Sequence, residues 1–588
     1  MKLWVHFSKN LKYFSIILTM LAFIVSILEV LGISSIVPFL AILADPSVIE
    51  DNEFISYLFE KAMYLGIGSY EDFTKVVAVS AISLFIFSIL GRAFYNFLTI
   101  KFIAGCEYEL SVAMFKKYVT SDYEHVIAND SAISKKNILS ETFMVSEHAI
   151  APMVTIVSQG LTLFFFLFAI LIVNIYVSII VLLFIIVLAL FILLPLSYIV
   201  MYLGDRRFKY NELRFKVTND SLSILKEIKV RGDENYFIDQ FSQISSNYRK
   251  ALSLMRGISI IPRYILEGVA FGSSLVAILF MYLHGTPFSE IIPIVTLYAL
   301  VGYRAMPALQ NIYTSFTAVR SMRGSVRGLL AQLEHQKTNQ KVNPVNEKWD
   351  IIGSDRVVPT VFFDRVSYNF PESDKTVIED LTLELKPGQC VGIVGKTGSG
   401  KTTLINILMG LFPPSKGSLK YQINDNTYSI DTVPSVKYGY VSQNIVLVDR
   451  SLAENVSLTE TDENINYERL RICLKISDLT DVVDKLDEGV HTFVGERGVR
   501  LSGGQRQRVA IARALYAEPS ILVFDEATSA LDIETEKVII DNIRELSSEI
   551  TIIMIAHRPQ SLRICDKIYE MNSGKISLKD AKLVVKND

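Results

Sequence analysis

The sequence predicts a helical transmembrane domain followed by an α/β domain. Half of the 588 residues are hydrophobic and the mean hydropathy is +0.35, which is too apolar for an ordinary soluble protein of this size. The long apolar runs lie before residue 335, whereas short β-branched strands, glycine turns and charged helices alternate after it. The predicted domains are therefore 1–335 and 359–588, joined by a polar linker at 336–358.

Six apolar runs in the first domain are each long enough to cross a hydrocarbon core of ~30 Å with ~20 residues. They lie at 14–43, 75–100, 148–173, 175–203, 258–283 and 287–318. Lysines precede the first span and lysines and arginines follow the fourth, so both flanks are predicted to be cytoplasmic. Polar segments after the second and fourth spans predict helices that continue into the cytoplasm, and the acidic segment after the first predicts a short outer-surface helix. The net charge of −3 provides no overall basic field, so no nucleic-acid partner is expected.

A phosphate-binding loop is predicted where an apolar strand meets the helix that begins TTLINILMGL. Its glycines allow backbone N–H groups to converge on phosphate oxygens at a helix N-terminus. Lys401 can neutralise phosphate charge, and the Thr402 hydroxyl can ligate Mg²⁺. The predicted binding residues are Gly395, Gly398, Ser399, Gly400, Lys401, Thr402 and Thr403.

Two further motifs follow the phosphate loop. ILVFDEATSALD is an apolar strand that ends in Asp525, suited to hold Mg²⁺ through water, and Glu526, suited to orient an attacking water. LSGGQRQRVAIARAL begins a helix with a second anion-binding N-terminus. Two such helix starts in one domain are redundant unless they face different nucleotides. The residues predicted at the second one are Ser502, Gly503, Gly504 and Gln505.

The phosphate loop, LSGGQ, DEATSALD and a later histidine, in this order, resemble the ATP-binding cassette of ABC transporters. The resemblance covers the second domain and implies an α/β P-loop fold that binds ATP and Mg²⁺ and hydrolyses ATP. It implies that Glu526 is the catalytic carboxylate, that Gln443 in YVSQ contacts the metal and the attacking water, and that His557 in MIAHR contacts the γ-phosphate. Lys401 completes the implied catalytic set.

The same resemblance places an adenine-stacking aromatic at Phe370, where the family usually has tyrosine, and Tyr368 is the competing candidate. The family pairs the phosphate loop of one cassette with the LSGGQ of another, so the chain is expected to act as a homodimer, with a heterodimer as the alternative. Six spans ahead of one cassette resemble the exporter branch of the family.

Three arginines lie inside or at the edge of predicted spans: Arg92, Arg263 and Arg304. An unpaired cation in a span costs at least ~2.5 to 3.5 kcal/mol, so a common explanation is needed. One interpretation is that they reach lipid headgroups or form pairs, Arg263 with Glu267 and another arginine with Glu29. The other is a cationic cavity that grips the phosphates of an anionic lipid.

The segments ISSIVPFLAIL, IPRYILEG and YRAMPALQNI resemble the PglK-type flippases, which turn polyprenyl-pyrophosphate-linked oligosaccharides across a bacterial inner membrane. This resemblance implies a lipid-linked oligosaccharide substrate for the three arginines and a multi-pass location in that membrane with the ATPase domain cytoplasmic. Export of lipid A, another glycolipid, a peptide or an amphipathic drug remains the alternative. The six spans oppose a cassette ATPase of DNA repair or translation, and an ATP-gated channel or regulator is a third alternative.

Overall fold

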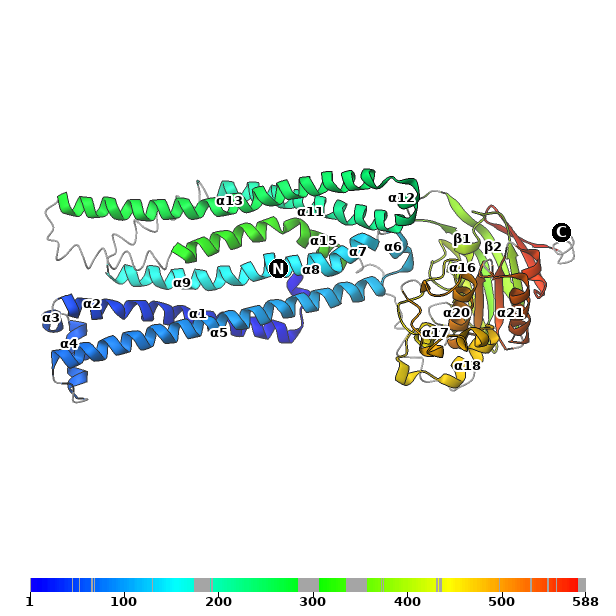
Figure 1. Cartoon of the computed structure of the whole chain (residues 1–588), viewed down its shortest axis with the longest axis horizontal. Coiled ribbons are helices and arrows are strands. Elements are labelled where there is room, and N and C mark those ends of the chain that lie inside the picture. Colours follow the sequence, from blue (N-terminus) through cyan, green and yellow to red (C-terminus); the bar gives the residue numbers. More distant parts are fainter. Residues whose placement is uncertain are drawn as a thin grey trace. The chain divides into compact units, whose positions relative to one another are not determined.

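The chain folds into two units. Unit 1 comprises Met1–Ser121 and His125–Thr338, and unit 2 comprises Asp122–Glu124 and Asn339–Asp588. The computed structural model describes residues 2–44, 46–51, 53–64, 67, 69–128, 131–173, 191, 194–283, 306–334, 357–371, 373, 375–429, 432, 436–495, 498–528, 531–546, 549–556 and 558–579. Figure 1 shows long helices in unit 1 and strands flanked by helices in unit 2.

Helices make up the described part of the first half of the chain. They are η1 (Lys2–His6), α1 (Lys9–Ser34), α2 (Ile36–Ala44), α3 (Val48–Asp51), α4 (Glu53–Met63), α5 (Tyr70–Val119), α6 (Tyr123–Ala128), α7 (Ser131–Lys135), η2 (Lys136–Glu141), α8 (Thr142–Val145), η3 (Ser146–Ile150), α9 (Ala151–Val173), α11 (Leu194–Ser223), α12 (Leu225–Arg231), α13 (Glu234–Leu283) and α15 (Arg323–Glu334). η2 and η3 are π-helical turns, each inserted between α-helical segments.

Three described helices are long and apolar enough to cross a membrane: Lys9–Ser34, Tyr70–Val119 and Ile133–Phe168. They overlap the first three predicted spans. At ~1.5 Å per residue, the 50-residue helices α5 and α13 are each ~75 Å long, more than twice the ~30 Å thickness of a hydrocarbon core. The predicted spans 175–203 and 287–318 fall largely outside the described residues.

The predicted first span, 14–43, is not one helix. α1 ends at Ser34 and α2 begins at Ile36, because Pro38 has no N–H to donate to the carbonyl of Ser34. Ser35 caps the end of α1, with its N–H donating to the Leu31 carbonyl at 2.9 Å. The break therefore leaves the end of α1 with a hydrogen-bonded cap.

Unit 2 contains two sheets. An antiparallel sheet has the order β2-β1-β4-β5, and a six-stranded sheet has the order β10-β9-β3-β8-β7-β6, parallel except for β10. The strands are β1 (Thr360–Asn369), β2 (Thr376–Leu385), β3 (Cys390–Val394), β4 (Lys416–Ile423), β5 (Asn426–Ser429), β6 (Tyr438–Val441), β7 (Ile521–Asp525), β8 (Thr551–Ile555), β9 (Lys567–Asn572) and β10 (Lys575–Lys579).

Both faces of the six-stranded sheet are buried. Ile521 and Val523 of β7 belong to one core cluster, whereas Leu522 and Phe524 belong to the other. This alternation follows from the two-residue period of a strand, and burial on both faces explains why ILVF is a continuous apolar run. The described helices of unit 2 are α16 (Lys401–Leu408), α17 (Leu452–Ser457), η5 (Asp462–Asn464), α18 (Tyr467–Ile476), α19 (Thr480–Val483), η6 (Gly489–His491), α20 (Gly503–Tyr516), α21 (Ile533–Glu545) and η9 (Pro559–Leu562).

Candidate functional site

The predicted nucleotide residues follow four neighbouring parallel strands of unit 2. In the order β3, β8, β7 and β6, these strands lie side by side, and each ends just before a predicted residue. β3 leads into Gly395, β7 ends at Asp525 with Glu526 directly after it, and β6 ends shortly before Gln443. Because the carboxyl ends of parallel strands share one edge of a sheet, the fold places these residues at a single site. His557 follows β8 but lies outside the described residues.

The loop between β3 and α16 has the backbone that a phosphate loop requires. Gly395, Gly398 and Gly400 adopt φ values of +155°, +78° and +105°, which residues with a Cβ rarely adopt. A Cβ on Gly395 would come within 2.3 Å of the Met571 carbonyl oxygen, and one on Gly400 within 2.9 Å of the Met571 methyl carbon. The loop is thus held against β9 in a conformation that exposes its amides ahead of α16.

Lys401 and Ser399 are buried in this loop. The Lys401 ammonium donates to the carbonyl oxygens of Gly395 at 2.8 Å and Lys396 at 3.1 Å. The Ser399 hydroxyl is buried and has no hydrogen-bond partner within the described part of the chain. A buried ammonium and a buried unpaired hydroxyl at the start of α16 fit the phosphate groups of a nucleotide.

Asp525 is buried and lies near Thr402, Lys401 and Tyr440. The Tyr440 hydroxyl donates to a carboxylate oxygen of Asp525 at 3.3 Å. Burial raises the pKa of Asp525. Hydrogen bonds from Tyr440 and Thr402 and the charge of Lys401 lower the pKa, but it stays above the ordinary value of an aspartate. A buried carboxylate beside a threonine hydroxyl is a donor set that suits Mg²⁺, so the residues present fit the metal.

Glu526 and Gln443 are joined directly. The Gln443 amide donates to the Glu526 carboxylate at 2.6 Å. Glu526 has a φ of +53°, a left-handed conformation that costs ~1–2 kcal/mol for a residue with a Cβ, and its N–H donates to the Ile555 carbonyl at 3.0 Å. Strain of this kind is concentrated at functional sites.

Tyr440 was not among the residues predicted from the sequence. It lies on β6, beside β7, and its neighbour across the ladder is Val523, two positions before Asp525. The available signal was its position in the strand that precedes Gln443. In the sequence, a tyrosine at this position resembles an ordinary core residue. Only the pairing of β6 with β7 shows that it lies beside Asp525.

The second predicted helix start is exposed at the surface of the chain. Ser502 caps α20 by accepting from the Gln505 amide N–H at 3.2 Å, while the Gln505 side chain accepts from the Ser502 N–H at 2.8 Å. Ser502 and Gly503 are exposed. Within the described residues, no hydrogen bond joins this helix start to the phosphate loop. The start of α20 is thus accessible at the surface of the chain.

The structure distinguishes the two candidate aromatics. Tyr368 is 1 % exposed and its ring stacks on Phe412 at 5.3 Å, whereas Phe370 is 40 % exposed. The Phe370 ring meets Tyr368 edge to face at 5.3 Å. Phe370 therefore has a ring surface free to stack on a base, and Tyr368 is a core residue of the antiparallel sheet.

Two of the three predicted arginines form pairs in unit 1. Arg92 of α5 lies 3.4 Å from Glu29 of α1, which also accepts from Thr162 of α9 at 3.3 Å. Arg263 lies 2.8 Å from Glu267 one turn along α13, with its side chain 52 % exposed. These are the pairs that the first interpretation of the arginines requires, so the substrate role stays a prediction. Arg304 lies outside the described residues.

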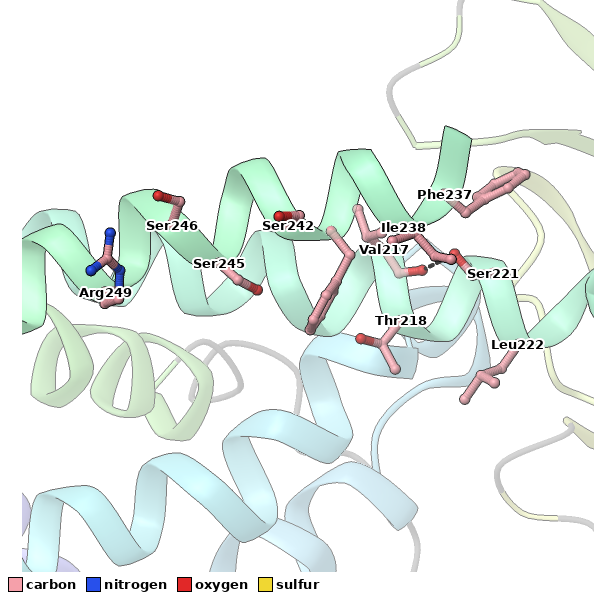
Figure 2. Close-up of a pocket in the computed structure, with 11 residues that line it drawn as sticks. Val217, Thr218, Ser221, Leu222, Phe237, Ile238, Ser242, Ser245, Ser246 and Arg249 are labelled. Carbon is pink, nitrogen blue, oxygen red and sulfur yellow. Dashed lines mark hydrogen bonds between the residues drawn. The ribbon is translucent and has the colours of Figure 1, made fainter. Parts of the chain in front are cut away.

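A hollow of about 760 Å³ lies between α11 and α13 in unit 1. Figure 2 shows hydroxyl-bearing side chains along both helices and Arg249 at one end. The Ser221 hydroxyl is already used, because it donates to the Val217 carbonyl at 2.7 Å, whereas the Ser245 hydroxyl has no partner among the described residues. Neither Arg92 nor Arg263 lines this hollow.

Comparisons with known proteins identify relatives of this part of the chain. A family model described as ABC transporter matches residues 378–529. Leukotoxin translocation ATP-binding proteins are similar over 216 residues, with 39 % identity for LktB of Mannheimia glucosida and 38 % for LktB of Mannheimia haemolytica and Bibersteinia trehalosi. These matches cover 37 % of this chain and 30 % of each relative, so the chain matches less than a third of the length of these curated relatives.

The similarity of fold extends further along the chain. A bacterial Atm1-family ABC exporter with ATP bound has a TM-score of 0.75, at 21 % identity, over 96 % of this chain and 95 % of that one. At this identity the likeness establishes the fold alone. The chain therefore has an exporter-type fold, a helical domain followed by an ABC transporter ATP-binding domain.

Proposed function

We propose that this chain, which has the fold of an ABC exporter and carries an ABC transporter ATP-binding domain, uses ATP hydrolysis to move an anionic lipid-linked substrate from the cytoplasmic to the outer leaflet of a bacterial inner membrane. The observation that carries the ATPase part is the placement of the phosphate loop, Asp525, Glu526 and Gln443 at the carboxyl ends of neighbouring parallel strands. This edge is where α/β sheets bind ligands.

Each residue at the site has a defined task. Loop amides and Lys401 bind the phosphates, and Glu526, oriented by the Gln443 amide, directs water toward the γ-phosphate for in-line attack. Thr402 and Asp525 would hold Mg²⁺, which supplies positive charge to the phosphate oxygens. His557 would contact the γ-phosphate from the end of β8.

The working form is a homodimer. The helix start at Ser502 is exposed, and no described hydrogen bond ties it to the phosphate loop. Two copies can complete two composite sites by placing the α20 N-terminus of one copy over the nucleotide of the other. ATP binding then closes the two domains together, and hydrolysis releases them.

The membrane substrate is a polyprenyl-pyrophosphate-linked oligosaccharide. Its support is the resemblance of three segments of the membrane half to PglK-type flippases and the half-exposed Arg263 within the predicted span 258–283. A guanidinium that keeps one carboxylate neighbour and an exposed face can still bind a phosphate through its remaining N–H groups. The three arginines of each copy would together face the pyrophosphate.

A leaflet-accessibility assay in proteoliposomes tests the substrate. We expect ATP-dependent flipping of polyprenyl-pyrophosphate oligosaccharide that is lost in Arg263→Ala and Arg304→Ala while basal ATPase activity remains. Arg231→Ala is the matched control, because Arg231 forms an exposed pair with Asp233 at 2.8 Å outside the predicted spans. If the lipid is not flipped while ATP is hydrolysed, the substrate assignment is wrong.

A second candidate substrate is a peptide or protein. The similarity of the ATP-binding domain to leukotoxin translocation ATP-binding proteins favours it. Export of a labelled amphipathic peptide into sealed vesicles, without flipping of the lipid-linked oligosaccharide, would establish this alternative instead.

A further inference from the structure

A second hollow in unit 1, of about 320 Å³, lies at the cytoplasmic end of the predicted spans. Its walls come from η1, α1, α5, η3, α9 and α15. The lining residues of α1 lie at the start of the predicted span 14–43, those of α5 near the end of 75–100, and those of η3 and α9 at the start of 148–173. By the predicted orientation, these three boundaries all lie on the inner side of the membrane.

The lining of this hollow is apolar. Trp4, Phe7, Tyr95 and Phe102 contribute rings, of which only that of Tyr95 carries a hydroxyl, and aliphatic side chains complete most of the remainder. The hydroxyls of Ser15 and Thr19 are used by their own helix, since they donate to the carbonyls of Lys12 at 2.7 Å and Ser15 at 2.9 Å. Water has few partners in such a space, and a dry apolar cavity of ~150 Å³ is already large enough to hold benzene. The hollow is therefore suited to an apolar occupant.

The N-terminal segment forms one wall of the hollow and also faces outward. Phe7, directly after η1, lies in the unit 1 core with its ring 5.9 Å from that of Trp4, while Trp4 and Val5 of η1 are exposed. A tryptophan beside lysines at the inner end of a span is typical of a segment at the level of lipid headgroups. By the predicted orientation, this wall of the hollow faces the inner leaflet.

Two lysines in the first turn of α1, ahead of the residues that line the hollow, have no anionic partner among the described residues. Lys12 lies one turn before Ser15 on the same face of α1, and its ammonium donates only to the Val5 carbonyl at 3.4 Å. The nearby carboxylate of Glu109 is engaged by the N–H and hydroxyl of Ser8. Within the described residues, neither Lys9 nor Lys12 forms an ion pair. Each is free to attract an anionic headgroup.

We propose that this hollow binds an acyl chain of an anionic phospholipid from the inner leaflet, with its headgroup at Lys9 and Lys12. The apolar lining selects the chain and the two unpaired ammonium groups select the charge of the headgroup. The assignment is independent of which substrate is transported. It requires only that unit 1 spans the membrane.

Lipid retention by the purified full-length chain tests the assignment. The probe is phosphatidylglycerol, compared with phosphatidylcholine of the same chains, measured by native mass spectrometry after delipidation. We expect the wild type to retain phosphatidylglycerol selectively. Lys9→Gln with Lys12→Gln should weaken that binding about thirtyfold, corresponding to about 1 kcal/mol per lysine, and leave phosphatidylcholine unaffected. Lys75→Gln, on the opposite end of α5 beside Glu71 and Asp72, is the control and should change neither.

Filling the hollow tests the binding of the acyl chain. Ala149→Phe should abolish retention of both lipids, and Val157→Phe, at an exposed lining position that tolerates bulk, is the second variant if the first does not fold. Unchanged basal ATPase activity confirms folding of either variant. Unchanged retention in a folded filled variant, equal retention of both phospholipids by the wild type, or displacement of phosphatidylglycerol by a polyprenyl phosphate would each overturn the proposal.

Discussion

A buried charge network in unit 1 allows a quantitative test of the packing. Lys136 of η2 is 1 % exposed and lies 3.8 Å from Glu141, which is 0 % exposed, and 3.6 Å from the half-exposed Glu212. The Lys136 ammonium also sits 3.9 Å above the Phe208 ring, and Asn211 donates to Glu141 at 3.4 Å. The network connects η2 with α11, and its Lys136 and Glu141 charges are out of contact with water.

Glu141→Gln removes the buried carboxylate but leaves the ammonium in place. Breaking one side of a buried pair costs ~3–5 kcal/mol because the remaining charge stays desolvated. Glu212, 3.6 Å from the ammonium, remains as a partner, so we expect a cost at the lower end, ~3 kcal/mol. Lys136→Met has a similar cost, with the carboxylate left unpaired. The double variant removes both charges, so its loss of unfolding free energy should be ~2–3 kcal/mol smaller than the sum of the losses in the two single variants.

The measurement is the free energy of unfolding of the purified chain in mixed micelles, titrated with SDS and followed by the helical circular dichroism. The same set of two single variants and one double variant, a double-mutant cycle, is made as a control at Lys575 and Glu379 of unit 2. This pair lies 3.4 Å apart, with side chains 68 % and 59 % exposed. Its coupling should lie between ~0 and 1 kcal/mol. A cost below ~1 kcal/mol for Glu141→Gln, or equal coupling in the two cycles, would refute the assignment of a desolvated pair.

Three further predictions concern the nucleotide site. Asp525→Asn should stabilise the nucleotide-free chain at neutral pH. Burial raises the pKa of Asp525 in the folded state above the ordinary carboxyl value of ~3.9. The folded state therefore binds the proton more tightly than the unfolded state, and the wild type loses stability as pH rises above ~3.9. The gain in melting temperature should therefore disappear in acid. Gly400→Ala should lower the free energy of unfolding by at least ~1 kcal/mol and weaken ATP binding, because φ is +105° and the new Cβ would lie 2.9 Å from the Met571 methyl. The control is Gly257→Ala, which has open space around it and should be neutral or stabilising. Phe370→Ala should raise the KM for ATP ~5–30-fold, the equivalent of ~1–2 kcal/mol, while Phe370→Tyr restores it; an unchanged KM would place the base elsewhere.

Local motifs predicted much of the nucleotide site. The phosphate loop, Asp525 and Glu526 depend on short stretches in which strand, turn and helix are adjacent in sequence, so their local structure follows from the pattern. The bond between Gln443 and Glu526 joins residues far apart in sequence, and only the pairing of β6 with β7 brings them together. The fold supplied that contact.

The membrane half was less predictable because its polar residues permit more than one environment. In the sequence, Arg92 within an apolar run is equally consistent with a substrate-binding residue and with a partner in an ion pair. The ion pair is seen only in the structure, where the packing of α1 against α5 places Glu29 beside Arg92. Lys136 follows another lysine in a polar helix and resembles a solvated residue, yet it is buried while Lys135 is exposed. The π-helical turn that begins at Lys136 adds a residue per turn and changes which side chains face the core.

The central claim is that the carboxyl-end site hydrolyses ATP with Glu526 as the residue that orients water. The most direct measurement compares the ATPase rate of the chain reconstituted in lipid with that of Glu526→Gln, alongside nucleotide binding by both; Glu545→Gln, at the end of α21, is the control. We predict at least a hundredfold loss of rate in Glu526→Gln, with ATP binding retained and the control unaffected. A Glu526→Gln variant that binds ATP and hydrolyses it at the wild-type rate would contradict the account.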